Sequence, residues 1–141
     1  HINLLPDNPL RGPNDETYGS RFPDMSMPYD KKMQAQAKAI ADELGYTTHK
    51  VVYVATAGPN LETRAEYKYM RMIGGDIVGM STIPEVIVAN HMSLPVFAIS
   101  VITDEGFQED LKPVSLSDIV QVAAAAEPKM TAILKVLIAM Q

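Results

Sequence analysis

The sequence lacks cysteine and tryptophan, and it holds only three histidines in 141 residues. Without cysteine there are no disulfides and no thiolate metal ligands. The histidines His1, His49 and His91 are scattered, so a metal site would need several carboxylates close in space. We therefore expect that the protein binds no metal.

Long runs of one sign of charge and long apolar runs are also missing. The net charge is −5, and lysine and arginine form no cluster of the kind that neutralises phosphates on a nucleic acid. No apolar run approaches the roughly 20 residues that span a bilayer, and nothing resembles a signal peptide. We expect a cytoplasmic protein that acts on a small molecule and contacts neither nucleic acid nor membrane.

Hydrophobic residues are plentiful, at 47% of the chain, which is enough for one ordinary domain with a buried core. We treat residues 1–141 as part of a single domain. The chain begins with "HINL" and not with methionine, so we expect that upstream residues of the natural protein are missing.

The first part of the chain predicts a loop followed by a helix. Residues 5–28 are rich in proline and have no apolar period, which is typical of a long ordered loop. Asp30 is a suitable N-cap for a helix that runs through Leu44, and Gly45 can end it.

Strands and helices are then expected to alternate. The pattern predicts strands at 50–57, 76–81 and 95–103, helices at 63–73 and from 82 onwards, a polar loop at 104–113, and a helix from 115 to 141 that is kinked or interrupted at Pro128. Thr82 and Glu85 have the spacing of a capping box, and Pro84 falls in the first helical turn. The order indicates an α/β fold with a mainly parallel or mixed sheet flanked by helices.

Ligands of such sheets bind outside the carboxyl ends of the strands. Three candidate positions follow the predicted strands: the turn from Gly58 to Glu62, the pair Met80 and Ser81, and the pair Thr103 and Asp104. We expect these positions to lie on one rim.

Glu62 has no evident structural role in that turn. The next residues, "TRAE", already form a capping box through Thr63 and Glu66, so Glu62 is left outside it. It could complement the helix dipole, but a spare carboxylate beside a Gly-Pro turn also suits paired N–H donors of a ligand.

The other rim residues leave two interpretations open. Ser81 is either a spare hydroxyl or an anion contact at a helix start. Met80 packs either in the core or against a ligand. Asp104 either caps its own loop or binds a ligand. His91 has no evident partner and is interpreted as structural. Phosphate-loop, dinucleotide and nucleophile-elbow motifs are absent.

Several stretches carry a family resemblance: "DNPLRGPNDETYGSRFPDMS", "AGPNLET", "VGMSTIPEVIVA" and "SVIT". Together they resemble the carboxyl-terminal half of the trimeric purine nucleoside phosphorylases. The resemblance implies a phosphorylase/hydrolase-like fold that is incomplete because the amino-terminal half is absent. It also implies phosphorolysis of purine (deoxy)nucleosides to free base and (deoxy)ribose 1-phosphate, with inorganic phosphate as co-substrate, no other cofactor, and a homotrimer when full-length.

The resemblance also implies roles for individual residues. Leu61 matches the position of an aromatic residue that packs on the base. Glu62 matches a residue that accepts from N1–H and the 2-amino group of the purine, and Met80 matches one that lies against the ribose. Ser81 matches a phosphate-binding serine. Tyr53 matches a tyrosine near the nucleoside, and Phe22 matches an aromatic that a neighbouring subunit contributes.

The sequence departs from the family pattern at three positions. Asp104 replaces an asparagine of the 6-oxopurine enzymes and favours a 6-aminopurine, whose N–H an aspartate accepts. Leu61 replaces an aromatic, and Leu116 stands near the place of a histidine at the ribose 5′-hydroxyl. Glu62 favours 6-oxopurines, because adenine N1 is an acceptor, and we expect this preference to prevail.

Two alternatives stay open. One is a phosphorylase directed at 5′-methylthioadenosine or adenosine. The other is a non-catalytic purine-binding or assembly fragment. Because the family's first half supplies most phosphate contacts, we expect the isolated chain to be inactive.

Overall fold

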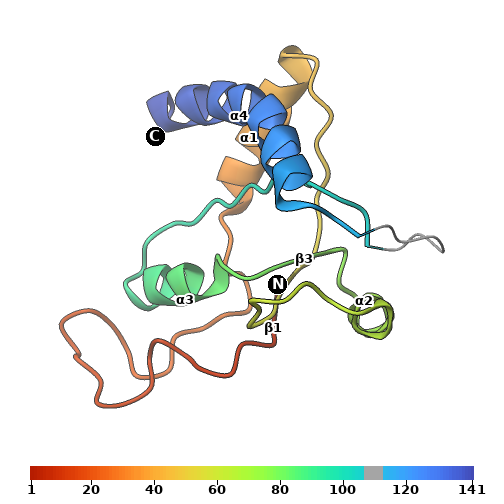
Figure 1. The fold of residues 1–141 in the computed structure, drawn as a ribbon. Coiled ribbons are helices and arrows are strands. Elements are labelled where there is room, and N and C mark those ends of the chain that lie inside the picture. The colour runs from red at the N-terminus through yellow and green to blue at the C-terminus, as the bar shows by residue number, and fades with distance from the viewer. Residues whose placement is uncertain (107–112) are drawn as a thin grey trace.

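The structure is a computed structural model that describes residues 1–106 and 113–141. Its described residues form a three-stranded sheet and four helices (Figure 1). The elements in chain order are β1 (Ile2–Asn3), α1 (Lys31–Glu43), β2 (Tyr53–Ala55), α2 (Arg64–Met72), β3 (Ile77–Gly79), α3 (Ile83–His91) and α4 (Leu116–Ala139).

The sheet has the order β1-β2-β3, and both strand pairs are parallel. In the register, Val54 lies opposite Ile2 on one side and Val78 on the other. Val54 and Ala55 point to opposite faces of the sheet and both are fully buried, so both faces are covered at β2. The predicted α/β fold with a parallel sheet is confirmed.

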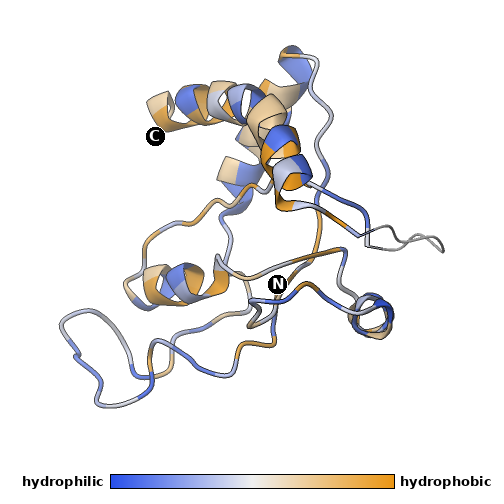
Figure 2. Cartoon of the chain, viewed as in Figure 1, coloured by the Kyte–Doolittle hydropathy of each residue, from blue (hydrophilic) through white to orange (hydrophobic). Residues whose placement is uncertain are grey.

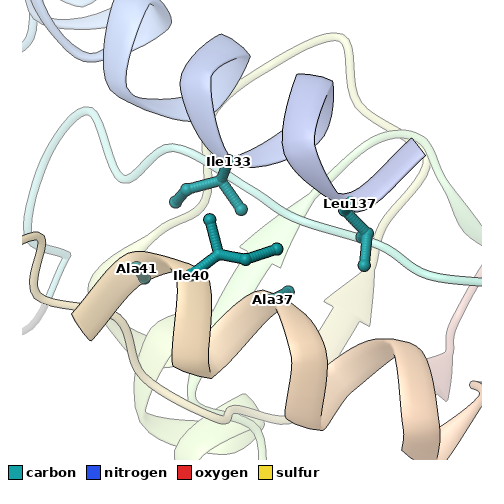
Figure 3. Packing of buried hydrophobic residues seen from close by; sticks show 5 residues of the cluster. All are labelled: Ala37, Ile40, Ala41, Ile133 and Leu137. Carbon is teal, nitrogen blue, oxygen red and sulfur yellow. The ribbon is translucent and has the colours of Figure 1, made fainter. Parts of the chain in front are cut away.

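Two separate apolar clusters hold the elements together. In the first, Ala37, Ile40 and Ala41 of α1 pack against Ile133 and Leu137 of α4 (Figure 3). In the second, α3 packs on the sheet through a buried cluster of Ala55, Ile83 and Ile87. This second cluster fixes the position of α3 relative to the carboxyl end of β2.

Helix starts follow the local sequence at three places. The side chains of Asp30, Thr63 and Ser115 accept hydrogen bonds from the backbone amides three residues later, which begins α1, α2 and α4 as predicted. Gly45, with φ +71°, follows the end of α1 in the left-handed conformation expected of a helix stop.

Strands were predicted less well than helices. Strand β2 covers only 53–55 of the predicted 50–57, and β1 was not predicted. The prediction of a strand at 95–103 is wrong, since no strand is assigned there. A strand requires backbone hydrogen bonds to a neighbouring strand. In this segment the Val96 carbonyl instead accepts from the amide of Asp30, just before α1, at 2.8 Å.

Two helix details also differ from the prediction. Thr82 forms no side-chain cap because its φ is +76°, although Pro84 does lie in the first turn of α3. Helix α4 continues through Pro128, so the predicted interruption is wrong. Of the polar loop predicted at 104–113, residues 107–112 lie outside the part of the chain that the structure describes.

The proline-rich stretch 5–28 contains no helix or strand, as predicted. His91, which ends α3 and is buried, does have a partner, because its Nε2 lies 3.0 Å from Asn14 Oδ1 in this loop.

Helix α2 is mainly hydrophilic, whereas α4 carries both hydrophilic and hydrophobic residues along its length (Figure 2). Among the described residues, no helix is long and apolar enough to cross a membrane, and no group of acidic or histidine side chains suits a metal ion.

Candidate ligand pocket at the carboxyl end of the sheet

A pocket of about 420 Å³ lies along strand β3, between it and the segment 101–106, and reaches the carboxyl end of that strand. Five residues named from the sequence line it: Leu61, Glu62, Met80, Thr103 and Asp104. They come from the turn after β2, the residue after β3 and the segment 101–106. The structure thus places all three predicted rim positions at one edge of the sheet.

Glu62 is oriented by protein contacts on the pocket wall. The capping box of α2 is complete without it, since the Thr63 amide donates to Glu66 Oε2 at 2.6 Å and the Glu66 amide donates to Thr63 Oγ1 at 3.2 Å. The hydroxyl of Thr56, one residue beyond β2, donates to Glu62 Oε1 at 2.8 Å. Glu62 is therefore held in place and is partly accessible from the pocket.

Glycine permits close approaches around Met80. Gly58 has φ +60°, and a Cβ there would lie 2.2 Å from Met80 Sδ. A Cβ at Gly79 would lie 2.3 Å from the Tyr53 hydroxyl oxygen. Any side chain at either position would displace Met80 or Tyr53, so both glycines shape the wall between the strand ends.

Asp104 lies at the other side of the pocket and is partly buried. The hydroxyl of its neighbour Thr103 donates to Asp104 Oδ1 at 2.8 Å. One oxygen of the carboxylate is thus engaged locally.

Ser81 lies next to the pocket but faces a second depression. Its amide donates to the Tyr53 hydroxyl at 3.3 Å, and its Oγ lies 3.3 Å from Thr82 Oγ1. Ser81 and Thr82 line a neighbouring, largely apolar groove of about 620 Å³. Ser81 thus lines this groove and not the pocket that Glu62, Met80 and Asp104 share.

Four residues named from the sequence do not line the pocket: Tyr53, Ser81, Phe22 and Leu116. Phe22 is 86% exposed on the long loop, with the Arg21 guanidinium 5.6 Å from its ring centroid. Leu116 is 76% exposed at the first position of α4, whereas Ile119, one turn later, lines the pocket. The structure does not bring Phe22 or Leu116 to the other candidate residues.

Tyr67 is a pocket residue that the sequence reasoning missed. Burial, then the negative charges of Glu62 and Asp104, then a hydrogen bond with Glu62 raise the pKa of its phenol above the ordinary value of 10.0. The phenol of Tyr67 thus shares the pocket with both carboxylates. The missed signal was its position in the first turn of a helix that starts at the rim.

The fold and the pocket define a member of the phosphorylase superfamily. The model of that family matches residues 1–139, and the chain belongs to it.

The relatives within the family are purine nucleoside phosphorylases, as the sequence resemblance predicted. The chain is 42% identical to purine nucleoside phosphorylase 1 of Bacillus subtilis over 139 residues, which are 99% of this chain and 51% of that protein. It is 50% identical to the Mus musculus purine nucleoside phosphorylase over 110 residues, 74% of this chain and 38% of that one.

A solved Schistosoma purine nucleoside phosphorylase in complex with hypoxanthine aligns with a TM-score of 0.90 at 35% identity. The alignment covers 97% of this chain and 52% of that one. The chain thus spans about half the length of the Bacillus subtilis relative and of this solved structure.

Proposed function

We propose that the protein containing this chain catalyses the phosphorolysis of purine (deoxy)nucleosides to free base and (deoxy)ribose 1-phosphate. The observation that carries the proposal is the pocket that Leu61, Glu62, Met80 and Asp104 share, with Ser81 directly after Met80 in the chain. The family resemblance implies a base contact for Glu62, a ribose contact for Met80 and a phosphate contact for Ser81. Relatives named purine nucleoside phosphorylase over most of the chain support the same reaction.

The chemistry needs charge stabilisation at two places. As the glycosidic bond breaks, negative charge develops on the purine and positive charge on the sugar. Glu62 would hold the N–H edge of the base, Leu61 and Tyr53 would bound the nucleoside, and Ser81 would donate to phosphate. The reaction needs no covalent intermediate, and we propose that inorganic phosphate is the co-substrate and that no other cofactor takes part.

We propose that 6-oxopurines are the preferred substrates. Glu62, held by Thr56, is an acceptor when ionised, so it suits the N1–H of hypoxanthine or guanine and opposes the N1 lone pair of adenine. The test is phosphate-dependent release of hypoxanthine and guanine from inosine and guanosine by the natural full-length protein. Absence of release from any purine nucleoside would contradict the proposal.

Asp104 supports a second candidate, a phosphorylase directed at 6-aminopurine nucleosides such as adenosine or 5′-methylthioadenosine. Its carboxylate accepts readily from a 6-amino group. One Schistosoma mansoni relative has been solved with adenosine and another structure shows a Schistosoma enzyme with guanosine. A competition between inosine and 5′-methylthioadenosine decides between the two candidates, and Asp104→Asn should shift the outcome toward inosine.

Phe22 supports the proposed homotrimer. An aromatic side chain that is 86% exposed on a loop suits a contact with another copy, and the family resemblance implies that it would contribute to a neighbouring subunit's pocket. The alternative of a non-catalytic purine-binding fragment concerns the 141-residue chain alone. Calorimetry of this chain with guanine, with and without phosphate, tests it, because such a fragment would bind the base independently of phosphate.

A further inference from the structure

His91 is a buried ionisable residue that has no part in the reaction proposed above. It is the last residue of α3, and its Nε2 lies 3.0 Å from Oδ1 of Asn14, 77 positions earlier in the sequence. Asn14 belongs to the proline-rich loop, which runs beside α3 (Figure 1). The contact therefore joins the end of α3 to the loop that carries Phe22.

The hydrogen bonds of Asn14 fix the direction of this contact. The Asn14 side-chain nitrogen donates to Glu16 Oε1 at 2.7 Å and to the Gly19 carbonyl at 2.9 Å. Both of its hydrogens are thus used within the loop, and Oδ1 is the atom that faces the imidazole. Because this oxygen can only accept, Nε2 of His91 carries the hydrogen and donates it.

Two further contacts hold the loop against the end of α3. A Cβ at Gly19 would lie 1.8 Å from the His91 carbonyl oxygen, so this approach of backbone to backbone requires glycine. The side-chain nitrogen of Asn90 donates to the Pro28 carbonyl at 3.0 Å. The last two residues of α3 therefore hold the loop at residues 14–19 and again at Pro28.

Phe22 lies between these two attachment points. The Arg21 guanidinium, 5.6 Å from the Phe22 ring centroid, donates to the Leu10 carbonyl at 2.7 Å. Leu10 and Met25 pack against the buried cluster between α3 and the sheet. The chain on both sides of Phe22 is thus tied to the domain, while the ring itself is 86% exposed.

We propose that His91 is a positioning residue that, through Asn14, holds the loop where Phe22 can reach the nucleoside pocket of a second copy of this chain. The inference rests on the proposed function, because it uses the homotrimer and the purine nucleoside proposed there. An exposed ring on a loop that is tied on both sides is already placed for its contact, which reduces the entropy lost on binding. Release of the loop would move the ring, and a shift of about 1 Å at a binding site is enough to weaken it.

The test is steady-state kinetics of Asn14→Ala in the natural full-length protein. Asn14 is half-buried on the loop, so the substitution removes the contact with His91 and leaves both apolar clusters intact. We expect the KM for the nucleoside to rise about fivefold, while kcat and the KM for phosphate change less than about twofold. His91→Leu should have the same effect, whereas His91→Gln, which keeps an N–H donor near the position of Nε2, should restore most of the wild-type KM.

A double-mutant cycle with Phe22→Ala separates positioning from a general loss of stability. If Asn14 acts through Phe22, Asn14→Ala should raise the nucleoside KM by less than about twofold once residue 22 is alanine. The same factor in both backgrounds overturns the inference, and so does an unchanged KM in Asn14→Ala. The control is Thr17→Ala, because the Thr17 hydroxyl donates to Asp15 within the same stretch of the loop, and it should leave the KM unchanged.

Binding and assembly separate this inference from the proposed function. If the wild type releases no base from any purine nucleoside, the proposed function fails, and calorimetry with guanosine then applies the same cycle to the affinity. Weaker binding by Asn14→Ala, with little further loss in the Phe22→Ala background, supports the inference. Equal affinities of Asn14→Ala and the wild type, or no binding of guanosine by the wild type, overturn it. A wild type that releases base but sediments as a monomer overturns the inference and leaves the proposed reaction in place.

Discussion

Two helices start at the same rim with the same spacing of residues and different outcomes. Helix α2 begins with Thr63 and Glu66 three positions apart, and α3 begins with Thr82 and Glu85 in the same arrangement. The first pair forms a complete capping box. The second forms none, because Thr82 has φ +76° and makes no side-chain cap.

The difference comes from the neighbours of Thr82. Ser81 before it donates its amide to Tyr53, and Ile83 after it is fully buried in the cluster with Ala55. The Ile83 amide also donates to the Ser81 carbonyl at 2.8 Å. Tertiary contacts on both sides therefore impose a backbone that a threonine adopts only under strain.

The comparison assigns different chemistry to the two helix starts. The start of α2 satisfies its own donors, so the acid beside it, Glu62, is free to accept from a ligand. The start of α3 keeps its first amides uncapped by Thr82, with the Ser81 hydroxyl beside them, an arrangement that favours an anion.

The largest effect is expected from Glu62→Gln. Two hydrogen bonds from the base to a charged acceptor become bonds to a neutral one or are lost, at about 1.5 to 3 kcal/mol each. We expect kcat/KM for guanosine to fall by about 100-fold or more in the natural full-length protein. Glu66→Gln, four residues away in the capping box, is the control and should lower stability but keep this activity.

Ser81→Ala should weaken the binding of phosphate. Removing a hydroxyl that donates to an anion costs about 1.5 kcal/mol, which corresponds to about tenfold in the KM for phosphate. The KM for the nucleoside should change much less, and steady-state kinetics with each substrate varied separately checks the split. The control is Ser93→Ala, at the far end of α3. Equal changes in both KM values would contradict a phosphate role for Ser81.

Opposite effects on stability are expected at the two threonines. Thr63→Ala removes a working cap and should lower the free energy of unfolding by about 1 kcal/mol. Thr82→Gly removes the strain at φ +76° and should raise it by up to about 1 kcal/mol. Urea unfolding of the two variants and the wild type measures both. A decrease in Thr82→Gly would show that its backbone is not strained.

These two helix starts also show what the sequence alone can predict. The caps at Asp30 and Thr63 were predicted because a cap depends on residues three positions apart, whereas at Ser115 only the start of the helix was predicted. The box at Thr82 failed because distant residues fix the backbone there. Strand β1 was missed for a similar reason, since Ile2–Asn3 is a strand only through its pairing with β2 some 50 residues later.

The same limit applies to the pocket. Glu62, Met80 and Asp104 were found because the carboxyl ends of parallel strands meet at one edge. Thr56 and Tyr67 were missed because their relation to Glu62 depends on side-chain contacts in space. A threonine directly after a strand, facing a rim that carries a spare acid, is the signal that would have pointed to Thr56.

The smallest effect concerns pH at the capped helix. Donation from the Thr63 amide and then its hydroxyl holds the pKa of Glu66 below its ordinary value of 4.5. A lowered folded-state pKa stabilises the protein above pH 4.5, and this contribution is lost as the pH falls through the folded value. The difference in urea midpoint between wild type and Glu66→Gln should therefore stay constant from pH 6 to 8 and shrink below about 4.5. A difference that stays unchanged below pH 4.5 would contradict this role of the Glu66 carboxylate in the capping box.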